Sequence, residues 1–111
     1  ITVKNHDTDE AYRMDTPALF LFIGAMPHSE CVAGIVERNS AGFILTGPDL
    51  MADGKRPKGW KPQRDPFLLE TSVPGIFAAG DVRQGATRRV AAAVGEGANV
   101  VSQVHQYLRT V

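Results

Sequence analysis

The alternation of hydrophobic and polar residues along the chain predicts several short strands. Residues Ile1–Asn5 alternate between apolar and polar side chains, which is typical of a strand with one buried face. Unbroken apolar runs at Ala18–Ile23 and Ile76–Ala79 indicate strands that are covered on both faces. Another strand is predicted at Gly42–Thr46, and Phe67–Leu69 is a shorter candidate that leads into the next turn. Short strands are therefore expected at five places before the C-terminal segment.

The C-terminal segment has the periodicity of an amphipathic helix that opens near Arg88. Apolar residues recur there at steps of three and four positions and form one stripe, the usual core-facing side of a helix. The stripe consists of Val90, Val94, Ala98, Val101, Val104, His105 and Leu108. Gly95 and Gly97 lie inside this helix, where each costs about 1 kcal/mol relative to Ala. Two such costs indicate close packing of the helix against another backbone or a cofactor.

The segments between the predicted strands are rich in turn-forming residues. Residues His6–Glu10 are polar and indicate a turn, whereas Cys31–Arg38 fits either a short helix or an extended piece. Residues Gly47–Pro66 contain four prolines and five Lys or Arg residues, which predicts a long exposed loop. A loop of that length in a compact domain usually has a function or is mobile.

A glycine and an aspartate follow the apolar run that ends at Ala79. Gly80 has no Cβ, so another backbone or a ligand can approach it closely. Asp81 places a carboxylate where the strand ends, which is the usual position of a ligand in an open α/β sheet. An aspartate in this position can equally cap a turn or a helix.

The start of the predicted helix is a second candidate site. Free backbone N–H groups and the helix dipole attract negative charge to a helix N-terminus. Arg88 and Arg89 place two cations there, against the usual preference of a first turn. Such exceptions often mark functional sites, although both side chains can also simply point to solvent.

Composition and charge exclude several classes of protein. Lys plus Arg and Asp plus Glu number 12 each, so the net charge of zero gives no indication of nucleic acid or a membrane surface as a partner. No apolar run approaches the about 20 residues of a membrane span. The single cysteine, Cys31, excludes a disulfide within the chain, fits a reducing cytoplasm and is expected to be a small buried hydrophobe. The three histidines are too scattered to predict a metal site.

Three motifs in the chain resemble those of thioredoxin reductases and their relatives. Residues 71–81, TSVPGIFAAGD, resemble the flavin signature T-S-x-P-G-hydrophobic-[FY]-A-x-G-D of that family. Residues 88–98 resemble the segment that opens the last helix, with Arg89 where the low-molecular-weight enzymes usually carry Gln. Residues 23–27 resemble the stretch in which the chain returns from the pyridine-nucleotide domain to the flavin domain.

The resemblance implies an α/β fold, a partial FAD/NAD(P)-binding domain that is Rossmann-like and three-layered, with a long C-terminal helix. Residues 1–24 would be the closing strands and return linker of the pyridine-nucleotide domain, and residues 25–111 the C-terminal part of the FAD-binding domain. By the same resemblance, Asp81 in the Gly80–Asp81 corner accepts a hydrogen bond from a ribityl hydroxyl of FAD, and the backbone amides near Arg89 and Val90 face the flavin.

The function implied is that of a flavoprotein that passes electrons from NADPH through FAD to a disulfide, on a thioredoxin-like protein for example. The chain is expected to be a piece of a longer protein, and that complete protein is expected to be a cytoplasmic homodimer. Alternatives are a ferredoxin–NADP reductase of the same fold and a flavin-free binding or regulatory module. The family's first FAD fingerprint, which binds the phosphates of FAD, is absent from these 111 residues, as are the NADPH-binding G-x-G-x-x-[GA] pattern and a redox C-x-x-C. Gly95-Glu96-Gly97 starts such a glycine pattern but lies inside the predicted helix, which indicates packing glycines. The isolated chain is therefore expected to be inactive and to hold FAD weakly.

Overall fold

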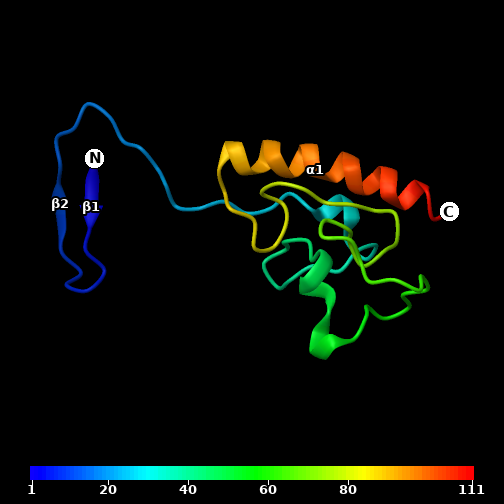
Figure 1. Cartoon of the computed structure of the whole chain (residues 1–111). Helices are drawn as coiled ribbons and strands as arrows, with labels where there is room; N and C mark the ends of the chain where they lie inside the picture. The colour runs from blue at the N-terminus through cyan, green and yellow to red at the C-terminus, as the bar shows by residue number, and fades with distance from the viewer.

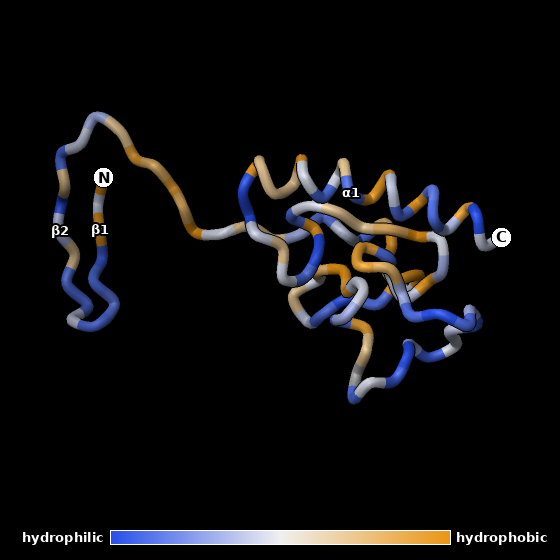
Figure 2. The backbone as a smooth tube through the Cα atoms, in the orientation of Figure 1, coloured by the Kyte–Doolittle hydropathy of each residue, from blue (hydrophilic) through white to orange (hydrophobic). Residues whose placement is uncertain are grey.

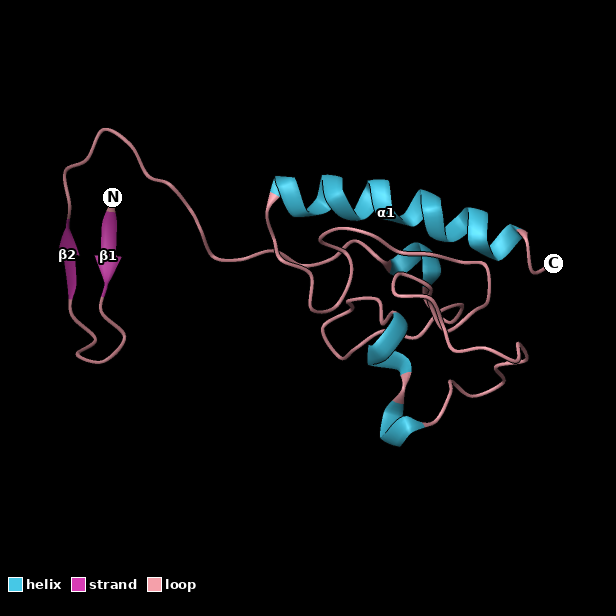
Figure 3. Ribbon diagram, in the orientation of Figure 1, coloured by secondary structure: helices cyan, strands magenta, loops and turns pink.

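The chain forms a small hairpin, an extended connection and a larger body that carries one long helix (Figures 1 and 3). The structure, a computed structural model, describes residues 1–111 apart from the side chain of Ala52. Its extents of 63 × 28 × 24 Å reflect a hairpin that stands away from the body. The N-terminus lies in this hairpin, and the C-terminus follows α1 (Val90–Leu108) at the opposite end of the molecule.

The hairpin consists of β1 (Thr2–Lys4) and β2 (Ala11–Arg13), which pair in antiparallel fashion with Val3 opposite Tyr12. The strand predicted at Ile1–Asn5 is thus confirmed over its central residues. β2 was not predicted, because three residues are too few to show a period of two. Within the described residues this is the only sheet of paired strands.

The apolar run Ala18–Ile23 is exposed, and the prediction of a buried strand there is wrong for this chain. Phe22 and Ile23 are 91% and 90% exposed. Figure 2 shows this hydrophobic stretch in the connection between the hairpin and the body. A buried strand needs a neighbour for its backbone N–H and C=O groups. No strand pairs with this run in the part of the chain that the structure describes.

The core of the body is small and is built from residues far apart in the sequence. Its buried members are Val36, Ile44 and Ala78, with Val32, Val73 and Val82 packed against them. Ile44 forms an antiparallel bridge with Arg38 and a parallel bridge with Arg83. The strand predicted at Gly42–Thr46 is therefore reduced to a single bridging position that joins two neighbouring segments.

The run Ile76–Ala79 is also extended but only partly covered. Phe77 bridges Glu70 in antiparallel fashion, and Ala78 is 7% exposed. Ile76, in contrast, is 37% exposed, so the prediction of a strand covered on both faces is wrong for this chain. The run pairs with only one other segment, through Phe77, so the described residues leave part of it uncovered.

Three short 3-10 helices occupy segments that were expected to be loop or uncertain. η1 (Glu30–Val32) supplies one turn at the start of the segment Cys31–Arg38, for which a short helix or an extended piece was expected. Cys31 is exposed, so its prediction as a small buried hydrophobe is wrong. In the single turn of η1, only Val32 is partly buried, and the thiol of Cys31 lies at the surface.

The segment Gly47–Pro66 is less exposed than predicted. It contains η2 (Gly47–Leu50) and η3 (Ala52–Gly54). Gly47 and Leu50 are buried, and the Gly47 N–H donates to the carbonyl of Glu70 at 2.9 Å. The start of this segment therefore belongs to the body, and composition alone did not reveal it.

α1 confirms the predicted helix and its start near Arg88, but its predicted apolar stripe faces outward. Val94 and Val101 of that stripe are 67% and 55% exposed. The side that meets the body instead carries Ala93, Glu96, Gln103 and Tyr107. The residues described here bury this mixed face because its polar groups find partners on the body.

Gly95 and Gly97 were predicted to pack against another backbone or a cofactor, and within this chain they pack against no other segment. A Cβ added at either position would meet no atom within 4 Å. Both glycines therefore lie on open sides of α1. The described residues contain one α-helix and one two-stranded sheet, and the three-layer arrangement stays a prediction.

Candidate functional site

The Gly80–Asp81 corner ends the extended segment as predicted from the sequence. The Ala78 N–H donates to Leu69 O at 2.9 Å, and the Arg83 N–H donates to Gly80 O at 3.0 Å, which closes a turn. Gly80 has φ of +80°, a conformation that favours glycine. Gly80 is buried against α1, whereas the Asp81 side chain is exposed.

Asp81 and Arg88 line the same pocket, which has a volume of about 250 Å3. Its other lining residues are mostly apolar. They are Val82, next to Asp81, and five residues from two further parts of the chain: Ala25, Met26, Pro27, His28 and Phe43. Among the described residues, the Asp81 carboxylate has no hydrogen-bond or ion-pair partner. It is therefore a free acceptor at the edge of an apolar pocket, and it caps neither a helix nor a turn.

The start of α1 leaves its first backbone amides available. Arg89 is the N-cap residue and makes no side-chain capping hydrogen bond. Its guanidinium donates instead to Arg88 O at 2.9 Å and is exposed, and Val90 is 83% exposed. The first N–H groups of an α-helix have no partner inside the helix. This end of α1 can therefore donate to an anionic group.

Arg88 lies over an aromatic ring that no sequence pattern singled out. Its guanidinium carbon is 4.6 Å from the centroid of the Phe43 ring. Cation–π contacts at this range contribute about 0.5–1 kcal/mol at exposed sites. The two residues are far apart in the sequence, and no local signal links them.

A second missed pair joins the corner to the helix. Glu96 accepts hydrogen bonds from the Gly80 N–H at 2.7 Å and from Arg83 Nη2 at 2.5 Å. The hydrogen bond from Arg83, opposed by burial and supported by the Gly80 N–H, holds the pKa of Glu96 below its ordinary value. Sequence reasoning had treated Glu96 only as the residue between two glycines.

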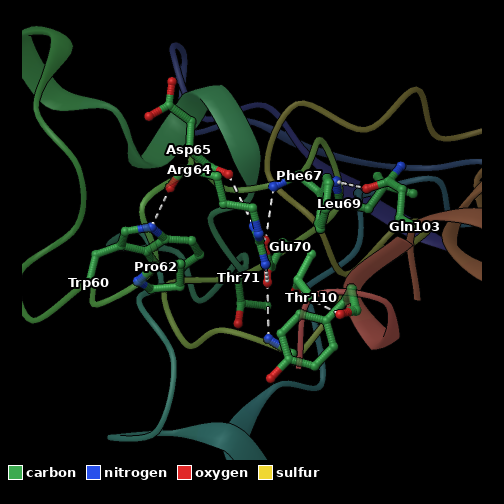
Figure 4. Close-up of polar contacts among 12 residues, drawn as sticks. Trp60, Pro62, Arg64, Asp65, Phe67, Leu69, Glu70, Thr71, Gln103 and Thr110 are labelled. Atoms are coloured by element: carbon green, nitrogen blue, oxygen red, sulfur yellow. Dashed lines mark hydrogen bonds and ion pairs between the residues drawn. The ribbon is translucent and has the colours of Figure 1, made fainter. Parts of the chain in front are cut away.

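A buried ion pair organises the turn that precedes this corner (Figure 4). The Glu70 carboxylate is fully buried and accepts from both terminal nitrogens of Arg64, at 2.6 and 2.9 Å. It also accepts from the N–H groups of Phe67 at 2.9 Å and Gly75 at 3.0 Å. Burial alone would raise the pKa of Glu70, but these donors outweigh it and lower the pKa. The Arg64 side chain is 22% exposed, and all four donors to the Glu70 carboxylate come from residues 64–75, which indicates that this network stabilises the turn.

A larger pocket of about 520 Å3 lies beside that network, near the C-terminus. Its lining includes Arg64, Pro74 and Tyr107 but none of the five predicted cofactor residues. Within the described residues, no three His, Cys, Asp or Glu side chains gather closely enough to hold a metal ion. Among the residues that the structure describes, no helix has the length and apolar character needed to cross a membrane.

The arrangement fits the part of FAD that the sequence resemblance suggests. A carboxylate without a partner at a pocket edge can accept from a ribityl hydroxyl, which is itself a donor. The uncapped amides of α1 suit the region of the flavin where negative charge gathers on reduction. Gly80 and Asp81 lie in the corner, Arg88 lines the same pocket, and Arg89 and Val90 begin the helix.

Comparison with known proteins places the chain in context. No protein-family model matches it. The mitochondrial thioredoxin reductase of Kluyveromyces lactis is 31% identical over 108 residues, which is 97% of this chain and 26% of that protein. One component of the alkyl hydroperoxide reductase of Pseudomonas putida is 33% identical over 95 residues, which is 86% of this chain and 15% of that protein.

The backbone comparison agrees with the sequence comparison. The crystal structure of thioredoxin reductase from Lactococcus lactis matches 99% of this chain and 30% of its own length, with a TM-score of 0.70 and 27% identity. This likeness supports an FAD/NAD(P)-binding fold of the Rossmann type. The chain spans about a quarter of the length of the curated relatives that it matches. The chain is therefore a homologue of the thioredoxin reductases, similar over its whole length to a segment of their sequence and fold.

Proposed function

We propose that this chain forms part of the FAD site of a flavoprotein that passes electrons from NADPH to a disulfide. The observation that carries the proposal is the Asp81 carboxylate, which is free of partners at the edge of a pocket shared with Arg88. The homology to thioredoxin reductases supports the same assignment. Bound FAD would supply the two-electron chemistry between the nicotinamide and the disulfide.

The residues of this chain would bind and orient the cofactor. Asp81 would accept a hydrogen bond from a ribityl hydroxyl, and Gly80 would allow the corner to turn tightly. The free helix amides, which begin at Val90, would face the flavin together with the Arg89 backbone, whose own N–H donates to Thr87 O at 2.7 Å. They would favour the negatively charged, reduced form of the flavin through their partial positive charge. Arg88, held over the Phe43 ring, would close one side of the pocket.

The acceptor would be a disulfide on a small partner protein such as a thioredoxin. A second acceptor is favoured by the similarity to a component of an alkyl hydroperoxide reductase, which points to the partner of a peroxide-reducing system. NADPH would bind to a part of the protein other than these residues, because the chain lacks the glycine pattern for it.

The domain assignment rests on the same homology. Residues 1–24 would belong to the pyridine-nucleotide domain and residues 25–111 to a three-layered FAD-binding domain of a homodimer. The separation of the hairpin from the body supports a boundary near this point (Figure 1). The outward stripe of α1 would then pack against other parts of that domain.

The test uses the complete protein, meaning the polypeptide in which residues 1–111 occur. The wild-type protein should purify yellow with bound FAD and should reduce a thioredoxin disulfide with NADPH. Asp81→Ala should weaken FAD retention by about tenfold or more, because a hydrogen bond to a charged acceptor contributes about 1.5–3 kcal/mol. Asp49→Ala, which removes an exposed carboxylate on η2, is the matched control.

Two results would contradict the proposal. A complete protein that neither carries nor binds FAD would favour the flavin-free module. A flavoprotein that reduces ferredoxin but no disulfide would favour a ferredoxin–NADP reductase. Equal FAD retention in both variants would remove Asp81 from the site.

A further inference from the structure

The Arg83–Glu96 pair joins the two elements that carry the cofactor-facing groups. Glu96 lies on α1, about 9 Å along the axis from its first residue, Val90. One of its carboxylate oxygens accepts from the Gly80 N–H at 2.7 Å and from Arg83 Nε at 3.2 Å. The other accepts from Arg83 Nη2 at 2.5 Å. A single carboxylate thus contacts both ends of the turn that displays Asp81.

The guanidinium of Arg83 extends this connection into the body. Its Nη1 donates to the hydroxyl of Thr46 at 3.2 Å and to Gln84 O at 3.1 Å. Thr46 is completely buried, so the guanidinium is anchored to the interior of the body. The side chains of Arg83 and Glu96 are themselves only 14% and 20% exposed.

These contacts fix the corner relative to the helix. In the part of the chain that the structure describes, Glu96 supplies the polar contacts between residues 80–84 and α1. Gly80 also approaches the apolar Ala93 of α1 closely, since a Cβ added at Gly80 would lie 3.5 Å from that of Ala93. Apolar contacts permit sliding, whereas charge-assisted hydrogen bonds fix direction.

We propose that Arg83 and Glu96 are positioning residues that set the distance and orientation of Asp81 relative to the amide groups at the start of α1. This inference rests on the proposed FAD site and adds to it. The pair carries no net charge, so it holds the corner without competing with Asp81 as an anion. We expect the pair to affect how tightly and in which orientation the cofactor is bound, because it fixes the backbone of Gly80.

The experiment compares Glu96→Ala, Glu96→Gln and Arg83→Lys in the complete protein, with Glu37→Gln as the matched control. Glu37 is exposed, and only its backbone is used in the contacts of the body. The readouts are the FAD dissociation constant, the visible spectrum of the bound flavin and hydrogen exchange of the Gly80 amide in FAD-free protein. The last readout reports on the corner without any cofactor.

Glu96→Ala should weaken FAD binding by about tenfold, shift the flavin spectrum and speed Gly80 exchange by about tenfold or more. Glu96→Gln keeps an acceptor for the Gly80 N–H, so it should restore part of the affinity and of the spectrum. Arg83→Lys should give an intermediate effect, because a lysine makes no forked contact. If Glu96→Ala does not fold, the two conservative variants carry the test.

The inference is overturned if Glu96 variants lose stability but keep the wild-type FAD affinity and flavin spectrum. The pair would then be only structural. It is also overturned if Gly80 exchange is unchanged in FAD-free protein. Wild-type protein that binds no FAD contradicts the proposed function itself, whereas wild-type binding with insensitive Glu96 variants contradicts this inference alone.

Discussion

Replacing Glu70 with Gln should lower the free energy of unfolding by about 3 kcal/mol. The wild-type carboxylate is completely buried and accepts four hydrogen bonds, two from Arg64 and one each from the N–H groups of Phe67 and Gly75. The substitution keeps the side-chain length and one acceptor oxygen. It removes the negative charge, and the new amide N–H₂ group, itself a donor, cannot accept from the donors that the second carboxylate oxygen had bound.

The magnitude follows from what the substitution leaves behind. Breaking a buried ion pair by changing one partner costs about 3–5 kcal/mol, because the other charge stays without compensation. The Arg64 side chain is 22% exposed, and its guanidinium carbon lies 4.0 Å from the Phe67 ring centroid. Water and the ring offset part of the loss, so we expect the lower end of that range.

The assay is urea unfolding of the FAD-free complete protein, combined with hydrogen exchange of the Phe67 and Gly75 amides. Both amides should lose protection in Glu70→Gln, since each donates to the carboxylate in the wild type. Glu37→Gln, at an exposed carboxylate, should stay within about 0.5 kcal/mol of the wild type. If Glu70→Gln is as stable as this control and keeps both amides protected, the network does not hold the turn.

The remaining predictions concern acid, one glycine and the exposed carboxylate. Since its native pKa is lowered from the ordinary value of about 4.3, Glu70 stabilises the fold fully above that pH and loses this contribution as the pH falls through the native pKa. Urea midpoints should therefore fall more steeply with acid in the wild type than in Glu70→Gln, and parallel curves would contradict this. Gly47→Ala should destabilise by about 2 kcal/mol more than Gly54→Ala in thermal melts. Its Cβ would lie 2.5 Å from Leu68 O, whereas at Gly54 it would meet nothing within 4 Å, so equal losses would refute the reasoning. Asp81→Ala should leave the unfolding free energy of FAD-free protein within about 0.5 kcal/mol of wild type, and a larger loss would make Asp81 a structural cap.

The local backbone around the candidate site was predictable from the sequence. A strand-like run followed by Gly80 and Asp81, and then a helix, is a local pattern, and the structure places these elements as expected. The positive φ of Gly80 and the start of α1 at Val90 depend on neighbouring residues in the chain. These steric and hydrogen-bond preferences act between residues that are close in the sequence, so a short sequence motif is enough to predict them.

The tertiary structure alone decided which faces are covered and which distant residues meet. Periodicity predicted the stripe of α1 but not which side meets the body, because a polar side chain such as Gln103 can be buried once its amide oxygen accepts from the Leu69 N–H at 2.9 Å. The run Ala18–Ile23 looks like a buried strand, yet burial requires a neighbouring strand that these residues do not supply. The contact between Arg83 and Glu96 could not be predicted either, because it depends on the path that the chain takes between the corner and the helix. The hydrophobic pattern of a segment indicates whether that segment prefers to be buried. Which other segment covers it is decided only when the whole chain has folded.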